Sequence, residues 1–161
     1  MSLTHRECTV RIQNKTSSFI LRDPRVHLQN GNCAIPLPPD LCPTESGTAL
    51  FKKMYEADFG SEGVFMYNIV HKSTNQELGQ LAVMFSILYE SDSNDYAVGE
   101  FSDIKQCDDE LYQEMWSEYK HESVRGEAKG PSLTHKGSHV TIRASMSDTN
   151  QAVLKVDICD N

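Results

Sequence analysis

The sequence contains no long apolar run. None of its apolar stretches approaches the roughly 20 consecutive residues that a membrane-spanning helix needs, and residues 1–7 contain no apolar signal region. The five cysteines include no Cys-x-x-Cys pair, and in the absence of a signal region we expect reduced thiols. We therefore predict a cytoplasmic protein as the chain is written, with secretion or peripheral attachment to a membrane as the alternatives.

Basic residues are scarce. Lysine and arginine together number 15, against 23 aspartates and glutamates, so the formal net charge is −8 at pH 7. Proteins that bind nucleic acid need a basic face to neutralise phosphates, and attraction to anionic lipid also depends on basic residues. The charge balance argues against both partners and is compatible with a neutral or zwitterionic ligand.

Motifs for catalysis and for metal binding are also missing. The sequence has no Gly-x-Ser-x-Gly elbow, no P-loop, no His-Glu-x-x-His and no dinucleotide fingerprint. His135 and His139 are four residues apart, but Gly137 lies between them in a predicted loop, which argues against a metal pair. The cysteines lack metal-ligand spacing and are expected to be small buried hydrophobes. We predict no enzyme, no metal and no cofactor.

The sequence does contain a series of short segments with strand patterning. Residues 81–89 form an almost unbroken apolar run, which is typical of a strand covered on both faces, and residues 64–70 form a second one. A polar turn at 73–76 joins them, so we expect a hairpin of the two most apolar strands. Near the C-terminus, residues 140–144 and 152–158 alternate apolar and polar side chains, as half-buried strands do.

One amphipathic helix is expected at residues 108–119. Asp108 or Asp109 can cap its first turn. Apolar and aromatic side chains recur there at helical spacing, namely Leu111, Tyr112, Met115, Trp116 and Tyr119. The rings of Tyr112 and Trp116 either close the helix onto a sheet or form a platform for a ligand, and the helical pattern leaves both interpretations open.

Regularly spaced strands with a single helix define the expected fold class. Residues 120–137 are polar and contain three glycines and one proline, which predicts a long surface loop. The whole pattern predicts a mainly β protein: an antiparallel β-sandwich with one flanking α-helix. With 161 residues, the chain is large enough to bury a core, and we expect a single domain spanning residues 1–161.

The order and spacing of these segments resemble the actinoporins, the sea-anemone pore-forming cytolysins. The matching segments are, in order, residues 81–86 followed by Tyr89, the helix at 111–116, Arg125-Gly126-Glu127 where the family usually carries Arg-Gly-Asp, and the strands 140–144 and 152–158. The resemblance covers nearly the whole chain from about Cys8. It implies a β-sandwich flanked by helices, a fold that the actinoporins share with the fungal fruit-body lectins.

The resemblance also implies a binding site. The family binds a phosphocholine headgroup, favouring sphingomyelin, in a pocket of aromatic rings and hydroxyls, where rings surround the quaternary ammonium. Ser86, Tyr112 and Trp116 match pocket positions of the family, and Tyr89 and Tyr96 lie in the neighbouring loop region. These five residues are the ligand-binding residues that we predict.

Several departures modify the implied function. Ser117 replaces a further tyrosine of the pocket, and the loop at 90–95 lacks the exposed rings that anchor the family at a membrane interface. Only residues 1–7 precede the first strand, where actinoporins begin with a pore-lining helix. The resemblance therefore implies a membrane-surface module that binds a phosphocholine or sphingomyelin headgroup, or a glycan, without lysis. The alternatives are a haemolytic, pore-forming cytolysin acting on sphingomyelin membranes, and a cytosolic glycan-binding lectin without lipid affinity.

Overall fold

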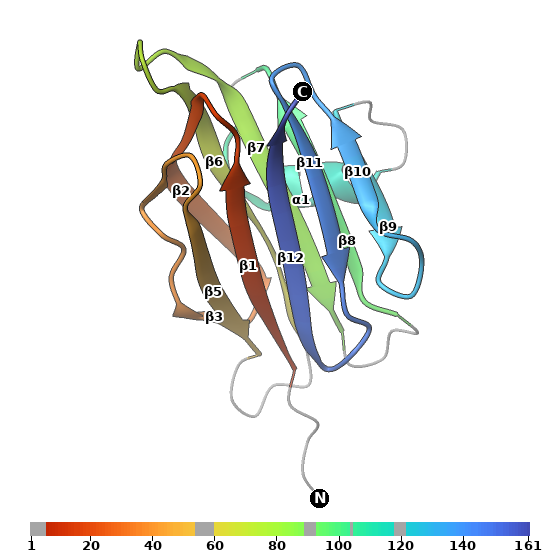
Figure 1. Ribbon diagram of the computed structural model, residues 1–161. Coiled ribbons are helices and arrows are strands. Elements are labelled where there is room, and N and C mark those ends of the chain that lie inside the picture. Colours follow the sequence, from red (N-terminus) through yellow and green to blue (C-terminus); the bar gives the residue numbers. More distant parts are fainter. Residues whose placement is uncertain (1–5, 54–59, 89–92, 104, 118–121) are drawn as a thin grey trace, which may run out of the picture.

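The computed structural model describes residues 6–53, 60–88, 93–103, 105–117 and 122–161. In this part of the chain, two six-stranded sheets stack face to face, and a helix lies on the outer surface of one of them (Figure 1). A large apolar core fills the space between the sheets. The architecture confirms the predicted mainly β fold, a β-sandwich with one flanking helix in the described residues.

The first sheet, called sheet A, places the two ends of the described chain side by side. Its strands are, in spatial order, β10 (Leu133–Lys136), β11 (Val140–Met146), β12 (Gln151–Asp160), β1 (Glu7–Lys15), β5 (Ser46–Lys52) and β3 (Asn32–Ile35). β1 and β12 pair in parallel, from Glu7 opposite Gln151 to Lys15 opposite Cys159. The other neighbouring strands of sheet A are antiparallel. Side chains alternate along the predicted strands β11 and β12, so that Ile142 and Val156 face the core.

The second sheet, called sheet B, is antiparallel throughout. Its strands are, in spatial order, β4 (Asp40–Leu41), β2 (Phe19–Asn30), β6 (Ser61–His71), β7 (Glu77–Ile87), β8 (Asp95–Phe101) and β9 (Ser123–Glu127). The predicted central hairpin is present as β6 and β7. The apolar run of β7 is covered on both faces, because Val83 and Phe85 enter the core between the sheets whereas Ala82 and Met84 pack beneath the helix.

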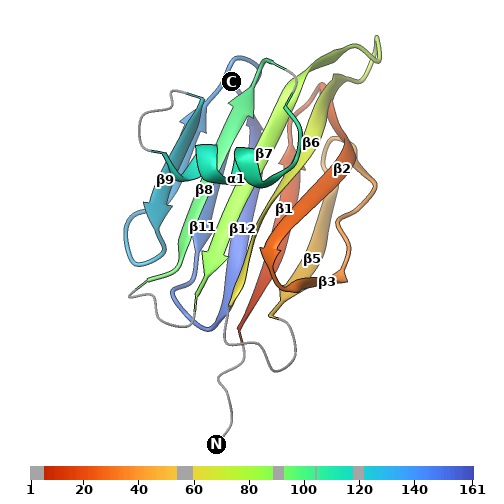
Figure 2. The same ribbon diagram turned by 180° about the vertical axis from the view of Figure 1, so that it is seen from behind.

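The helix α1 (Asp109–Trp116) crosses the outer face of sheet B (Figure 2). The Asp108 side chain caps it by accepting a hydrogen bond of 3.0 Å from the backbone N–H of Leu111, as one of the two predicted caps. Leu111 and Met115 bury their side chains in a second apolar cluster between α1 and the sheet. In the described residues, no helix combines the length and the apolar character that crossing a bilayer requires.

The prediction of one long loop over residues 120–137 was wrong. The described part of that segment contains the edge strands β9 and β10, which continue the two sheets. These strands are short and mostly polar, so their own side chains carry little strand signal. β9 owes its conformation to the ladder with β8, and the lack of a side chain at Gly126 leaves room for Leu133, whose Cδ2 lies 2.8 Å from where a Cβ would stand.

Two buried polar side chains join the sheets. The Asn14 amide donates hydrogen bonds of 2.9 Å to the backbone carbonyls of Phe19 and Leu41, which ties β1 to β2 and β4. On another strand of sheet B, the Glu100 carboxylate accepts from the backbone N–H groups of His139 and Val140, both at 3.1 Å. Because both groups are buried, each of these contacts fixes how one sheet sits on the other.

Candidate functional site

A row of polar side chains runs across the outer face of sheet B. Asn30 of β2 pairs with Glu62 of β6, Glu62 pairs with Ser86 of β7, and Ser86 pairs with Asp95 of β8. Residues directly opposite one another on neighbouring strands point to the same face, so these four side chains share the face on which α1 lies. The apolar residues of this face are covered by the helix, and the polar row meets it through Tyr112.

The Glu62 carboxylate is the centre of this row. It accepts a hydrogen bond of 2.7 Å from the Tyr112 hydroxyl and a longer one, 3.4 Å, from the Ser86 hydroxyl, both to Oε2. The amide of Asn30 donates to Oε1. All three donors are uncharged, and no basic side chain of the described residues forms an ion pair with Glu62. The Glu62 carboxylate therefore has no ion-pair partner among the described residues.

The Tyr112 hydroxyl remains a donor over a wide pH range. Burial raises the pKa of this phenol well above its ordinary value, and the neighbouring Glu62 carboxylate raises it further. A protonated phenol can donate its hydrogen bond to the carboxylate, whereas a phenolate could not. This coupling orients the Tyr112 ring at the junction between the helix and β6.

Trp116 adds a second ring and brings a cation with it. Its ring meets Tyr112 edge to face, with centroids 6.3 Å apart at 73°. The guanidinium carbon of Arg125 lies 5.0 Å from the centre of the Trp116 ring, and the Arg125 Nε donates to the Trp116 carbonyl at 3.1 Å. Arg125 also forms an ion pair of 3.3 Å with Asp95. The protein's own cation therefore covers one face of this ring.

The structure brings three of the five predicted residues together. Ser86 and Tyr112 both donate to the Glu62 carboxylate, and Trp116 packs against the Tyr112 ring. Their role in binding a ligand stays a prediction. Tyr96 does not join them: it is 1% exposed, lies in the core between the sheets, and directs its hydroxyl at the Ala144 carbonyl 3.4 Å away. Successive residues of a strand face opposite sides, so Tyr96 points away from α1 while its neighbour Asp95 points towards it. The prediction for Tyr89 lies outside the described residues.

Sequence reasoning missed Glu62 and Arg125. Glu62 interrupts an apolar strand at a position that shares a face with Val64 and Met66, and a charge inside such a pattern is a signal that could have been followed. Arg125 lay in the segment that was assigned to a loop. Its position against Trp116 follows only from the pairing of β9 with β8.

A metal site finds little support. Asp40, Cys42 and Glu45 offer ligand atoms within 4.8 Å of one another at the surface. The pKa of the Cys42 thiol is raised by partial burial and then by the neighbouring Glu45, which disfavours the thiolate that a metal requires. The absence of a bound metal stays a prediction.

The expectation that all cysteines are buried was wrong for Cys33, which is exposed; Cys8 is the fully buried one.

Comparison with known proteins identifies the fold. No protein-family model and no curated protein sequence matches the chain. Among solved structures, the crystal structure of the lipid binding protein Nakanori superposes with a TM-score of 0.73 at 13% identity, covering 95% of this chain and 70% of that one. The structure of IP-1A from Alcaligenes faecalis superposes with a TM-score of 0.51 at 11% identity, covering 98% and 93% respectively. The chain thus shares its fold with a protein that is described as lipid binding, and membership of the actinoporin-like family stays a prediction.

Proposed function

We propose that the protein is a membrane-surface binding module that recognises the phosphocholine headgroup of lipids such as sphingomyelin, at the junction of α1 with β6 and β7. One observation carries the proposal: the Tyr112 ring, which packs against Trp116, donates to the Glu62 carboxylate, and no cation of the described residues forms an ion pair with that carboxylate. The similarity in fold to a protein described as lipid binding also supports a role in binding lipid.

The chemistry of the site suits a zwitterion. A quaternary ammonium has no hydrogen to donate, so it is recognised by ring faces and by negative charge. The half-buried Trp116 ring and the half-buried Glu62 carboxylate supply both, and the buried Tyr112 ring contacts each of them. The phosphate of the same headgroup needs a cation and N–H donors, which the Arg125 guanidinium can supply. Arg125 holds its position through Trp116 and Asp95 before any ligand arrives, which lowers the entropy lost on binding.

Binding rather than catalysis is proposed for this site. Glu62 is contacted by a phenol, a hydroxyl and an amide, and the neighbouring Trp116 ring is covered by an arginine in an ion pair. Such groups are suited to recognition. A glycan is the second ligand class, because an aromatic ring and a carboxylate are also groups on which a sugar can stack and hydrogen-bond. The experiment below separates the two.

The proposal is tested by titrating the protein with soluble phosphocholine. Trp116 is the single tryptophan of the chain, so its fluorescence reports directly on the site. Calorimetry then compares Trp116→Ala with Trp116→Phe. If a cation–π contact contributes about 1–2 kcal/mol, Trp116→Ala should bind roughly 5- to 30-fold more weakly, and Trp116→Phe should lose less. Tyr96→Phe is the matched control, because that ring lies on the opposite side of sheet B.

The outcomes distinguish the candidate functions. Saturable binding to phosphocholine that Trp116→Ala weakens supports the proposal. Equal affinity in Trp116→Ala and in the unaltered protein would remove these rings from the site. Release of an encapsulated dye from sphingomyelin vesicles would support the pore-forming alternative. Binding on a glycan array without any response to phosphocholine or to sphingomyelin vesicles would support the lectin alternative.

A further inference from the structure

The outer face of sheet A carries a charge opposite to that of the chain. This face is made by the side chains that alternate with the buried residues of its strands. Its basic members are Arg11, Lys15, Lys52, Lys136, Arg143 and Lys155. Its acidic members are Glu7 and Asp157. The chain as a whole has more acidic than basic residues, 23 against 15, so this face is a basic surface on an acidic protein.

Two of these cations stand directly opposite one another. Arg11 of β1 pairs with Lys155 of the parallel strand β12, and both side chains point outward and are exposed. Like charges at directly opposite positions destabilise a sheet. Neither has an acidic partner in the described residues, whereas Lys15, in the same groove, forms an ion pair of 3.1 Å with Asp157. Arg11 and Lys155 therefore present two uncompensated positive charges at one place.

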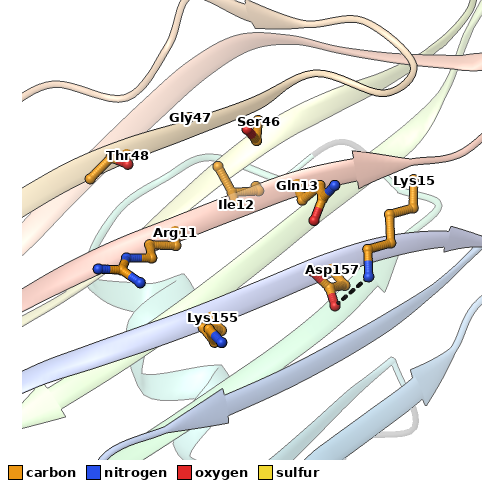
Figure 3. Close-up of a pocket in the computed structure, with 9 residues that line it drawn as sticks. All are labelled: Arg11, Ile12, Gln13, Lys15, Ser46, Gly47, Thr48, Lys155 and Asp157. Atoms are coloured by element: carbon orange, nitrogen blue, oxygen red, sulfur yellow. Dashed lines mark hydrogen bonds and ion pairs between the residues drawn. The ribbon is translucent and has the colours of Figure 1, made fainter.

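A groove lies at this place. Its volume is about 360 Å³, and it is lined by residues of β1, β5 and β12. Figure 3 shows Arg11, Thr48 and Lys155 on three neighbouring strands, and the pairing places Thr48 directly opposite Arg11 on the side away from Lys155. Ser46 and Gln13 form the next row of the same groove. The groove thus combines two hydroxyls and one amide with the two cations Arg11 and Lys155 and with the ion pair of Lys15 and Asp157.

We propose that this groove binds an oxyanion, a phosphate or sulfate monoester, between Arg11 and Lys155, with hydrogen bonds from the hydroxyls of Thr48 and Ser46. A guanidinium binds two oxygens of such a group through parallel N–H donors, and an ammonium adds a second charge. An anion placed between the two side chains also relieves their mutual repulsion.

The oxyanion groove is separate from the proposed headgroup site. It lies on the outer face of sheet A, whereas α1 lies on the outer face of sheet B, so the whole sandwich stands between them (Figures 1 and 2). The protein could therefore hold a headgroup on one face and an anionic ligand on the other. This inference goes beyond the proposed function and does not depend on it.

The test measures binding of inorganic phosphate and inorganic sulfate by two-dimensional NMR at low ionic strength, where screening is weak. Arg11→Gln and Lys155→Gln should each weaken binding about tenfold or more. Arg143→Gln is the matched control: it removes one charge from the same face, but Arg143 does not line the groove. It should change the affinity less than twofold. Because all three side chains are exposed, the variants should fold, and a thermal unfolding curve checks this.

A second experiment tests whether the oxyanion belongs to a lipid or to a soluble molecule. Vesicles that contain phosphatidic acid present the same phosphate monoester on a lipid. Binding to these vesicles that Arg11→Gln abolishes, without binding of the free ions, would assign the groove to a lipid phosphate. Saturable binding of the free ions without binding to the vesicles assigns it to a soluble ester, and binding of both shows that the groove accepts the group from either source. Equal losses in Arg143→Gln and Arg11→Gln, or no response to any of the three probes, would overturn the proposal. Phosphocholine is itself a phosphate monoester, so its binding at the headgroup site is followed through Trp116 fluorescence. That signal should be unchanged in Arg11→Gln, so failure here is distinct from failure of the headgroup site.

Discussion

Arg125 lies over Trp116, with its guanidinium carbon 5.0 Å from the ring centre. The Arg125 Nε also donates a hydrogen bond to the backbone carbonyl of Trp116. One face of this ring therefore has a cation before any ligand binds. At the aromatic site that the sequence predicts, the protein's own Arg125 already covers one ring face that a ligand cation could use. The negative charge at the site comes from Glu62 on β6, which accepts from the Tyr112 hydroxyl, whereas Arg125 is on β9.

Replacing Arg125 with glutamine should separate the two halves of the headgroup. If Arg125 contacts the phosphate, Arg125→Gln should bind phosphocholine about tenfold more weakly. Choline, which lacks the phosphate, should bind several-fold more tightly, because a like charge has left the site. Calorimetry with both ligands measures this. Arg143→Gln, on the other sheet, should change neither affinity, and parallel losses for choline and phosphocholine would assign Arg125 a structural role alone.

Glu62→Gln should test the carboxylate without altering the shape of the site. The amide oxygen can still accept from the Tyr112 hydroxyl, but the negative charge is lost, and choline should bind about tenfold more weakly. The same change should lower the pKa of Tyr112, because the Glu62 carboxylate contributes to raising it. The difference in ultraviolet absorbance between the variant and the unaltered protein at alkaline pH measures that shift. A Tyr112 titration that is identical in both proteins would contradict the coupling.

The patterns that predicted the fold correctly are local ones. The apolar run of β7 and the four-residue spacing of Leu111 and Met115 can be recognised in one strand or one helix, and each appears where expected. The strand β9 was missed because an edge strand with polar side chains is stabilised by its hydrogen-bonded neighbour, and that neighbour is not visible in the segment itself.

The features that the sequence did not reveal depend on strand register and on which side of the sheet each side chain faces. Alternation along β8 is visible in the sequence, but it does not tell which set of side chains faces the helix, and Tyr96 belongs to the set that faces the core. The net charge of the whole chain similarly hides the basic face of sheet A, because the acidic residues that outweigh it lie elsewhere. Both features follow from strand pairing, which cannot be read from the sequence alone.

Asn14→Ala should destabilise the protein strongly. The Asn14 amide is fully buried, donates to two backbone carbonyls, and accepts from the backbone N–H and the hydroxyl of Thr16. Its removal leaves buried carbonyls without donors, so the free energy of unfolding should fall by about 2–4 kcal/mol. Urea unfolding measures this. Gln13→Ala, on the exposed face next to it, should stay within about 0.5 kcal/mol of the unaltered protein. Equal stability of the two variants would show that the Asn14 contacts contribute little.

The buried thiol of Cys8 should make the protein less stable at alkaline pH. Burial raises the pKa of Cys8 well above its ordinary value, and the nearby Glu7 raises it further. In the unfolded chain the thiol should titrate near its ordinary value of about 8.5. As the pH rises above that value, the unfolded chain releases the proton and the folded chain retains it. The free energy of unfolding should then fall by about 1.4 kcal/mol per pH unit for this group.

Urea unfolding between about pH 8.5 and pH 9.5 tests the contribution of Cys8, because ordinary tyrosines, with a pKa of about 10, are still mostly protonated in that range. Cys8→Ala lowers stability at every pH by leaving a small cavity, so the slope against pH is the informative quantity rather than the absolute value. The slope should become shallower by about 1 kcal/mol per pH unit in Cys8→Ala, because the unfolded thiol is only half ionised at the lower end of this range. It should stay closer to that of the unaltered protein in Cys33→Ala, because the Cys33 thiol is exposed. A slope that Cys8→Ala leaves unchanged would mean that this thiol ionises as readily in the folded chain as in the unfolded one, contrary to its place in the core between the sheets.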